Sequence, residues 1–265
     1  MMIDRMHRSD IVISIPHAGT DIPPDIRSRM PHSDEVLLKE PDLYTDRIYH
    51  VEGVKTVMSP WSRLIGDCNR APDEIYTEGR LRASGVIILS QADGFDVFES
   101  DPAISEMEEW IVRFHTPYHD ALTAALFDAK FLIDGHSMAS VGAPGHIDPG
   151  HERADIELGN REYCSCSAET TQFFRRYFEE FGYSVAVNDP YSGRYILGTY
   201  CSRLRTPGIQ IEVNRKLYLN EETHEPFDDV ITRLNAEMHT LVDRFIDWYG
   251  ETAPADEKPM TDLSE

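Results

Sequence analysis

Two histidines in this chain each follow a short apolar run. The run Ile11–Ile15 leads into His17, and the run Phe131–Ile133 leads into His136. Ligands and catalytic groups collect at the carboxyl ends of strands in open α/β sheets, so both side chains are expected at one edge of a sheet. One such histidine alone more often caps a strand by hydrogen bonding. The repeated context favours a metal site.

A carboxylate is expected to complete that site. Zinc prefers imidazole nitrogens together with a carboxylate, and a catalytic zinc site keeps one position open for water. Asp42 and Asp46 lie four residues apart, so they share one face if the segment is helical. We prefer Asp42, which starts the segment after Pro41, and leave Asp46 as the alternative. The sequence therefore predicts one Zn2+ per chain.

Glu212 lies between Ile211 and Val213 in a third apolar run. A buried and unpaired charge is costly, so its side chain either points into the site or pairs with a cation such as Arg215. Desolvation raises the pKa of a carboxyl group towards neutrality, which suits a general base that acts on water. We predict that Glu212 is the catalytic base.

Further polar residues are candidates for substrate binding. Arg63, Asn69 and Arg70 offer guanidinium forks and an amide that suit a carboxylate, although Arg70 and Asp67 could instead pair on the surface. Two more candidates are Asn214, which follows the Glu212 strand, and Tyr195, which ends a Gly- and Pro-containing turn.

The elements that must position these side chains follow from hydrophobic periodicity. Strands are predicted over 10–15, 55–58, 131–133, 154–158, 184–187 and 209–213. Helices are predicted over 33–50 with a break at Pro41, and over 102–129, 168–181 and 226–249. This alternation implies an α/β fold: a mixed, mostly parallel sheet with helices on both faces. The stretch 140–153, rich in Gly, Pro and His, predicts a mobile loop beside the site.

Composition restricts the class of protein. A chain of 265 residues that is 41% hydrophobic can bury one large core, so residues 1–250 are expected to form a single catalytic domain. Residues 251–265 are charged and lack a pattern, which predicts a disordered tail. The formal net charge of -22 argues against nucleic acid and anionic membranes as partners.

Localisation is expected to be cytoplasmic. No apolar run approaches the ~20 residues of a membrane span, and the N-terminus lacks the apolar segment of a signal peptide. The four cysteines have no CxxC spacing, which is typical of reduced thiols. The expected partner is a small-molecule substrate, and the expected assembly is a monomer or a small homo-oligomer.

Six groups of residues, taken in order, resemble the N-formylglutamate amidohydrolase family, which is related to the zinc carboxypeptidases. They are Pro16-His17-Ala18-Gly19, Asp42-Leu43-Tyr44-Thr45-Asp46, Ser62-Arg63 with Asp67-Cys68-Asn69-Arg70, Asp134-Gly135-His136-Ser137, Asn188-Asp189-Pro190-Tyr191, and Gln210-Ile211-Glu212-Val213-Asn214-Arg215 with Leu217-Tyr218. The resemblance spans about residues 11–220. The ordered set is far more specific than any one motif.

The resemblance implies a zinc-carboxypeptidase-like (phosphorylase/hydrolase-like) fold. It also implies that His17 and His136 hold zinc, that Asn69 with Arg70 grips a substrate carboxylate, and that Glu212 activates water. Thr20 stands where the carboxypeptidase-like motif has a glutamate, which supports Asp42 as the remaining ligand. The implied reaction is zinc-dependent hydrolysis of a small N-acyl amino acid, with N-formyl-L-glutamate as the leading substrate and histidine catabolism as its setting.

Two other functions fit parts of the pattern. A catalytically inactive metal- or ligand-binding protein on the same fold would keep the zinc and hydrolyse no acyl amino acid. A dimanganese ureohydrolase needs an Asp-x-His-x-Asp motif, and here Met138 occupies the place of the second aspartate. The second alternative is therefore the less favoured one.

Overall fold

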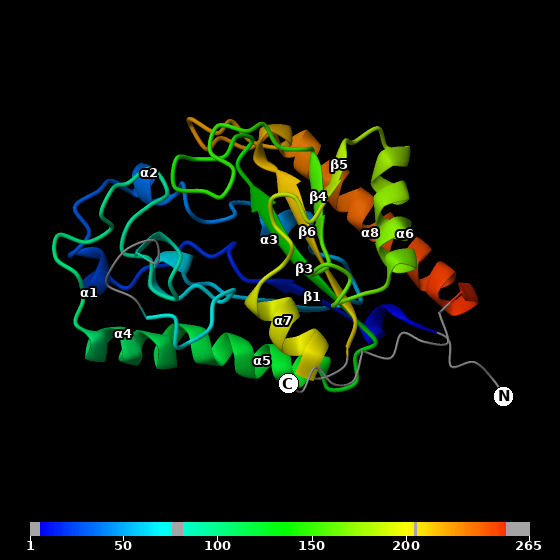
Figure 1. The fold of residues 1–265 in the computed structure, drawn as a ribbon, viewed down its shortest axis with the longest axis horizontal. Helices are drawn as coiled ribbons and strands as arrows, with labels where there is room; N and C mark the ends of the chain where they lie inside the picture. Colours follow the sequence, from blue (N-terminus) through cyan, green and yellow to red (C-terminus); the bar gives the residue numbers. More distant parts are fainter. Residues whose placement is uncertain (1–5, 76–81, 204–205, 253–265) are drawn as a thin grey trace.

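A six-stranded sheet lies between two groups of helices (Figure 1). The computed structural model describes residues 6–75, 82–203 and 206–252. The strands are β1 (Ile11–Ile15), β2 (Lys55–Met58), β3 (Phe131–Met138), β4 (Ile156–Gly159), β5 (Val185–Val187) and β6 (Gly208–Asn214). Their order is β2-β1-β3-β6-β4-β5, and every neighbouring pair is parallel except β4 with β6. The predicted mixed, mostly parallel sheet is confirmed.

The helices connect and cover these strands. They are α1 (Pro24–Arg27), α2 (Asp34–Leu37), α3 (Thr45–Ile48), α4 (Ile104–Trp110), α5 (Thr116–Leu126), α6 (Ala168–Glu180), α7 (Tyr195–Arg203) and α8 (Asp228–Thr252). Short 3-10 turns occur at η1 (Arg8–Asp10), η2 (Arg63–Ile65) and η5 (Arg215–Leu217), and a π-helical segment, η4 (Ile111–His115), joins α4 to α5.

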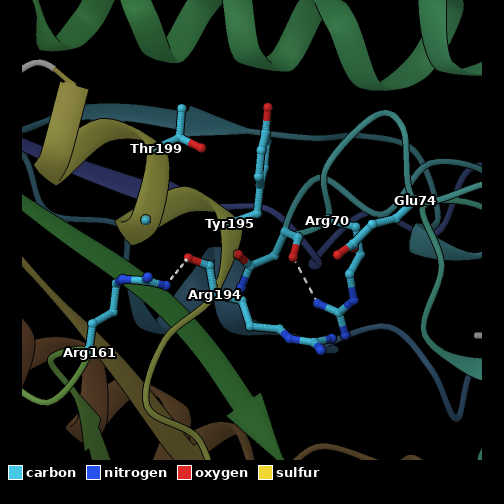
Figure 2. A pocket seen from close by; sticks show the side chains of 8 residues that line it. Arg70, Glu74, Arg161, Arg194, Tyr195 and Thr199 are labelled. Carbon is cyan, nitrogen blue, oxygen red and sulfur yellow. Dashed lines mark hydrogen bonds between the residues drawn. The ribbon is translucent and has the colours of Figure 1, made fainter. Parts of the chain in front are cut away.

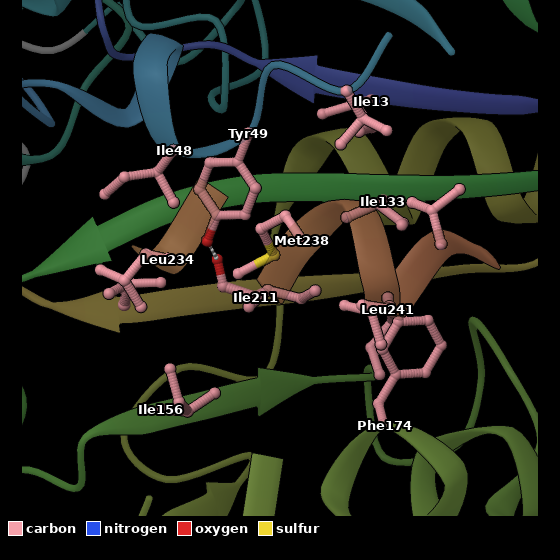
Figure 3. Close-up of a cluster of buried hydrophobic side chains, with 14 of the residues drawn as sticks. Ile13, Ile48, Tyr49, Ile133, Ile156, Phe174, Ile211, Leu234, Met238 and Leu241 are labelled. Carbon is pink, nitrogen blue, oxygen red and sulfur yellow. Dashed lines mark hydrogen bonds between the residues drawn. The ribbon is translucent and has the colours of Figure 1, made fainter. Parts of the chain in front are cut away.

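The apolar runs of the strands are continuous because both faces of the sheet are buried. In β1, Ile13 belongs to the core that includes side chains of α3, α6 and α8, whereas Val12 belongs to the core that includes side chains of α5 and α7. Figure 3 shows the first of these cores, where Leu241 and Phe174 lie over the strands. Burial on both faces holds β3 and β6, which carry polar residues of the site, at the centre of the sheet.

Three elements differ from the sequence prediction. The helix expected over 33–50 is divided near Pro41, as predicted, but its two parts, α2 and α3, have only 4 residues each, and the backbone before α3 turns through Tyr44 in the left-handed region, with φ 65°. Strand β3 continues past Ile133 to Met138, so His136 lies within the strand. Helix α7 begins at Tyr195, where only a turn was expected.

The structure describes the whole of one further predicted segment, the loop over 140–153, and only the start of another, the tail over 251–265. The loop over 140–153 contains a bridge between Val141 and Glu152, and the buried Arg153 side chain near its end pairs with Asp148. Helix α8 ends at Thr252, and the rest of the predicted tail lies outside the described residues. Among those that are described, no helix is long and apolar enough to cross a membrane.

Gly135 of β3 lies against the ring of Tyr49. A Cβ at this position would lie 2.8 Å from Cγ and Cδ2 of the buried Tyr49 ring. The Tyr49 hydroxyl donates to the carbonyls of His136 and Ile211, so the ring cannot move aside. We expect Gly135→Ala to lower the free energy of unfolding by about 1–3 kcal/mol in urea denaturation.

Gly250 provides the matched control, because a Cβ there meets nothing within 4 Å and the residue lies in α8. Alanine is the better helix former, so Gly250→Ala is expected to keep or raise stability. Equal stability of Gly135→Ala and the wild type would show that the strand can shift away from the Tyr49 ring.

Candidate active site

Three buried ligand atoms meet at the carboxyl ends of β1 and β3. Nδ1 of His17 lies 3.2 Å from Nδ1 of His136, and Oδ2 of Asp42 lies 3.5 Å and 3.3 Å from these two nitrogens. In the part of the chain that the structure describes, these residues form the only His, Cys, Asp and Glu group spaced to hold a metal ion. Asp46 is exposed, so of the two aspartates only Asp42 reaches the histidines.

Local backbone contacts bring Asp42 to this place. Its N–H donates to the carbonyl of His17 at 2.9 Å, and its Oδ2 accepts the N–H of Ser137 at 3.2 Å. The aspartate is therefore tied to the chain that follows β1 and to β3. The break at Pro41 removes this segment from any long helix, which lets the side chain point inward.

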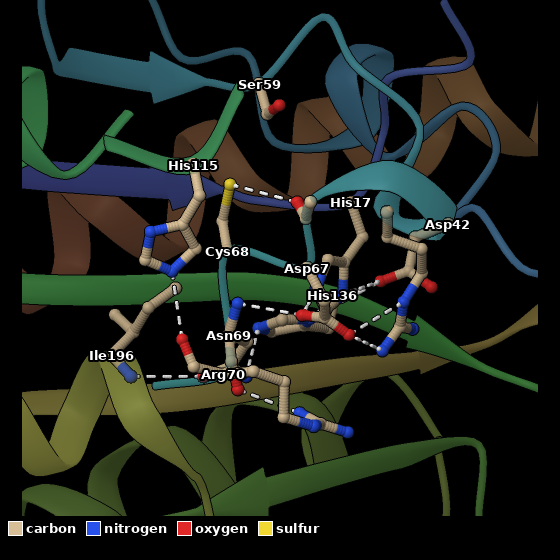
Figure 4. Close-up of polar contacts among 12 residues, drawn as sticks. His17, Asp42, Ser59, Asp67, Cys68, Asn69, Arg70, His115, His136 and Ile196 are labelled. Atoms are coloured by element: carbon tan, nitrogen blue, oxygen red, sulfur yellow. Dashed lines mark hydrogen bonds and ion pairs between the residues drawn. The ribbon is translucent and has the colours of Figure 1, made fainter. Parts of the chain in front are cut away.

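Each histidine has a carboxylate on the side away from the other. Oδ1 of Asp67 lies 2.7 Å from Nε2 of His17 (Figure 4), and Oδ2 of Asp134 lies 3.0 Å from Nε2 of His136. A carboxylate on one ring nitrogen fixes the tautomer and makes the other nitrogen a stronger ligand. Both Nδ1 atoms are thus prepared for a cation. Two imidazoles and a carboxylate are a donor set that fits zinc.

The two histidines and Arg215 keep Asp42 ionised. Burial alone would raise the pKa of Asp42, but the contacts with His136 and His17 and the charge of Arg215 outweigh burial and hold that pKa well below its usual value. Nη2 of Arg215 donates to Oδ1 of Asp42 at 2.8 Å. The sequence offered Arg215 as a partner for Glu212; in the structure it pairs with Asp42 instead.

Glu212 faces the same site from the neighbouring strand. It pairs in register with His136 of β3, it is 6% exposed, and its Oε1 accepts a hydrogen bond from Nε2 of Gln210 at 2.9 Å. Burial, with Asp42 and Asp134 adding to it and His136 opposing it, raises the pKa of Glu212 to about 7. A carboxylate with this pKa can both take and return a proton near neutral pH.

A second buried glutamate, which the sequence analysis did not single out, lies beside it. Glu157 of β4 stands directly opposite Glu212 in the antiparallel register, and its Oε1 accepts the N–H of Tyr191. Burial and the charge of Glu212 raise the pKa of Glu157 to about 9, so it is protonated at neutral pH. The pattern Ile156-Glu157-Leu158 repeats the apolar–Glu–apolar pattern around Glu212, and that signal was available in the sequence.

A pocket of about 350 Å³ lies beside Asn69, the neighbour of His136. It is lined by Asn69, Arg70, Glu74, Arg161, Arg194, Tyr195, Gly198 and Thr199 (Figure 2). Nδ2 of Asn69 lies 3.4 Å from Nε2 of His136, so one wall of the pocket contacts this ring at the nitrogen that faces away from His17 and Asp42. The structure therefore brings together three of the predicted substrate-binding residues: Asn69, Arg70 and Tyr195.

The other two predicted substrate-binding residues, Arg63 and Asn214, do not line this pocket. Nη2 of Arg63 donates to Oδ2 of Asp67 at 2.6 Å, so this arginine holds the carboxylate behind His17. Nδ2 of Asn214 donates to the carbonyls of Arg153 and Ala154, and its Oδ1 accepts the N–H of Lys216. Both side chains are occupied by protein contacts.

Two histidines hold the turn that carries Asp67 and Asn69. Nε2 of His115 lies 2.9 Å from the carbonyl oxygen of Arg70, and Nε2 of His119 lies 3.0 Å from that of Cys68. Burial lowers the pKa of both rings, that of His119 to about 3, so they are neutral at physiological pH. Their role in the structure is to position this turn.

Comparisons with known proteins place this geometry in context. Residues 9–219 match the family model described as N-formylglutamate amidohydrolase. The crystal structure of N-formylglutamate amidohydrolase from Ralstonia eutropha is similar, with a TM-score of 0.80 and 25% identity over 90% of this chain and 93% of that one. A gene product of Agrobacterium tumefaciens shares the fold, with a TM-score of 0.64 and 16% identity over 95% of each chain. A search of curated proteins finds no match.

Proposed function

The chain belongs to the N-formylglutamate amidohydrolase family, and from this premise we propose that it hydrolyses N-formyl-L-glutamate to formate and glutamate with the help of one zinc ion. The observation that carries the proposal is the buried group of His17, Asp42 and His136 with Glu212 on the adjacent strand. The pocket beside it, rich in arginine, supports an anionic substrate.

Each part of the proposed reaction uses a residue of this site. A zinc ion held by His17, Asp42 and His136 would act as a Lewis acid that lowers the pKa of water and polarises the acyl oxygen. Glu212 takes the proton of the attacking water and gives it to the nitrogen of the departing amine. The pKa of about 7 at Glu212 suits both transfers.

Arg70 is the proposed anchor for the α-carboxylate of the substrate. Its Nε donates to the carbonyl of Ser84 and its Nη1 to that of Asn69, which fixes the guanidinium and leaves other N–H groups for a ligand. Burial and the nearby charge of Arg194 lower the pKa of Arg70 to about 10. A bound carboxylate would offset this unfavourable environment.

Arg70→Ala is expected to raise KM by roughly ten- to a hundredfold, because a charge-assisted hydrogen bond is worth about 1.5–3 kcal/mol. Steady-state kinetics on N-formylglutamate measures the change. Arg244→Ala, which removes a surface arginine paired with Glu180 on α6, is the matched control and should leave KM unaltered. Equal wild-type activity on a substrate whose α-carboxylate is an amide would contradict this role.

A hydrolysis screen tests the proposed function itself. Zinc-loaded protein is mixed with N-formyl, N-acetyl and N-succinyl amino acids, and release of the free amine is followed. We expect N-formyl-L-glutamate to give the highest kcat/KM. A protein that binds zinc and hydrolyses none of these amides would refute the proposal and favour an inactive binding protein on the same fold.

Location and assembly form a further part of the proposal. The four cysteines are free thiols, and Cys68, Cys166 and Cys201 are buried, which supports a reducing compartment such as the cytoplasm. A place in histidine catabolism, in a monomer or small homo-oligomer, rests on the family resemblance alone.

A further inference from the structure

The pocket beside the candidate metal site contains more positive charge than one carboxylate needs. Arg70, Arg161 and Arg194 all line it, and among the described residues none of the three forms a salt bridge. Glu74 is the single carboxylate in the lining, and it lies on the Arg70 side of the pocket, away from Arg161 (Figure 2). Three guanidinium groups that share one pocket and form no salt bridge with a carboxylate of the described residues indicate an anionic ligand.

Arg161 is held in the pocket by its surroundings. Its Nη1 donates to the carbonyl of Arg194 at 3.2 Å, at the start of helix α7. Its own backbone adopts the left-handed region, with φ 52°, which is unfavourable for a residue with a Cβ. The side chain is thus directed into the pocket by a backbone conformation and a hydrogen bond together.

Helix α7 leaves room for this guanidinium. Gly198 lies in the helix interior, where glycine is less favourable than alanine. A Cβ at Gly198 would lie 3.0 Å from Nη1 and 3.2 Å from Cζ of Arg161. The helix therefore has its weakest helix former at the position where any side chain would press on Arg161. Packing of Arg161 against α7 therefore explains why residue 198 is a glycine.

The positions of the arginines relate them to different parts of a substrate. Arg70 adjoins Asn69, whose side chain reaches His136, so Arg70 lies on the side nearest the reacting amide. Arg161 comes from the chain after β4 and lies on the opposite side of the pocket, whereas the side chain of Arg194 extends toward that of Arg70 (Figure 2). In an N-acyl acidic amino acid the α-carboxylate is nearer the amide by covalent connection, and the side-chain carboxylate is farther.

We propose that Arg161 binds the side-chain carboxylate and determines specificity for acidic over neutral N-acyl amino acids. This inference rests on the proposed function for the position of the scissile amide. Arg161 is thereby a specificity residue, distinct from Arg70, which every N-acyl amino acid would use.

Paired substrates test this division. N-formyl-L-glutamine matches N-formyl-L-glutamate in shape and lacks only the side-chain charge. We expect wild type to favour the glutamate substrate in kcat/KM. Arg161→Gln should reduce that preference by roughly ten- to a hundredfold, mainly through KM for the glutamate substrate. Arg175→Gln, at a surface pair with Glu179 on α6, is the control and should keep the preference.

Gly198→Ala separates specificity from stability. Alanine strengthens the helix, so the melting temperature should stay the same or rise, while the new methyl group presses on Nη1 and Cζ of Arg161 and should reduce the preference for the acidic substrate. An unchanged preference in both Arg161→Gln and Gly198→Ala would overturn the proposal. Should Arg161→Gln fail to fold, Gly198→Ala alone decides it.

A binding measurement keeps this inference separate from the proposed function. Glutarate, a dicarboxylate without an amide, is titrated into wild type and the variants by calorimetry. We expect binding to wild type and Arg175→Gln, and at least about tenfold weaker binding to Arg161→Gln. Binding without turnover would refute the proposed function and support the pocket. Turnover with equal binding of glutarate by wild type and Arg161→Gln would overturn the pocket and keep the function.

Discussion

Glu212→Gln is expected to lower kcat by a factor of ~10²–10⁴, because glutamine keeps the shape of the side chain but cannot accept a proton from water. The fold should be retained, since Nε2 of Gln210 donates to Oε1 of Glu212 and an amide oxygen accepts the same bond. Steady-state kinetics and thermal unfolding on the same preparation provide the two readouts.

Glu157→Gln is the matched control, because it makes the same change on the strand directly opposite. With a pKa of about 9, Glu157 is already neutral at pH 7, so replacing it with a neutral amide should alter kcat far less. A comparable loss of kcat in both variants would mean that the effect is general to buried carboxyl groups here, and not specific to the base.

The pH dependence has a definite sign. Glu212 acts as a base only when it is ionised, so wild-type kcat/KM should fall as the pH drops below about 7, and the variant should lose that limb. For stability, the folded-state pKa of about 7 lies above the ordinary 4.5, so the folded protein binds the extra proton between these values. Stability should therefore decrease as pH rises from about 4.5 to 7.

Glu212→Gln has no group to ionise at this position and so does not lose stability as the pH rises. At pH 8 it should therefore be at least as stable as wild type. A variant that melts at a lower temperature and yet retains activity per folded molecule would identify Glu212 as a structural partner.

Loss of metal is the second large effect expected. Purified protein should contain about one zinc ion per chain, and His17→Ala or His136→Ala should lose most of it together with activity, because each removes one of the three proposed protein ligands. Elemental analysis after gel filtration measures the content. His151→Ala removes an exposed histidine and should retain the metal.

Asp67→Asn offers a graded version of the same experiment. It keeps the hydrogen bond to Nε2 of His17 possible but removes the charge, and changes to such outer partners typically cost 10–100-fold in metal affinity. Equal zinc in wild type and both histidine variants would eliminate the proposed site.

Much of the fold follows from hydrophobic pattern. Strand β2 has the predicted bounds, and β1, β5 and β6 differ from prediction by a single residue at one or both ends. Every residue of β1 and β6 is buried, and buried apolar runs with turn residues beside them specify strands strongly. Helix α7 could not be found in this way. It is short and contains Gly198, and its packing of Ile196 and Leu197 into the core, which local propensity does not reveal, is what stabilises it.

The site was predictable where it lies on strands and unpredictable where distant residues pair. His17 and His136 meet because β1 and β3 are adjacent and parallel, as the apolar runs suggested. Arg63 looked equally suited to a substrate, but its partner Asp67 already binds His17. Nothing in the sequence singles out Arg161, because its proposed role depends on the space at Gly198, which only the folded chain shows.

The place of β6 in the sheet has a consequence for the order in which the chain can fold. Residues Gly208–Asn214 form the strand between β3 and β4, although they come after both in the sequence. During synthesis from the N-terminus, β3 and β4 therefore each expose an open edge until β6 leaves the ribosome, and such edges recruit foreign strands. All three candidate metal ligands have been synthesised once His136 is added, whereas Glu212, the candidate base, is added later with β6, the strand that joins β3 to β4. Completion of the sheet and completion of the catalytic site are the same event.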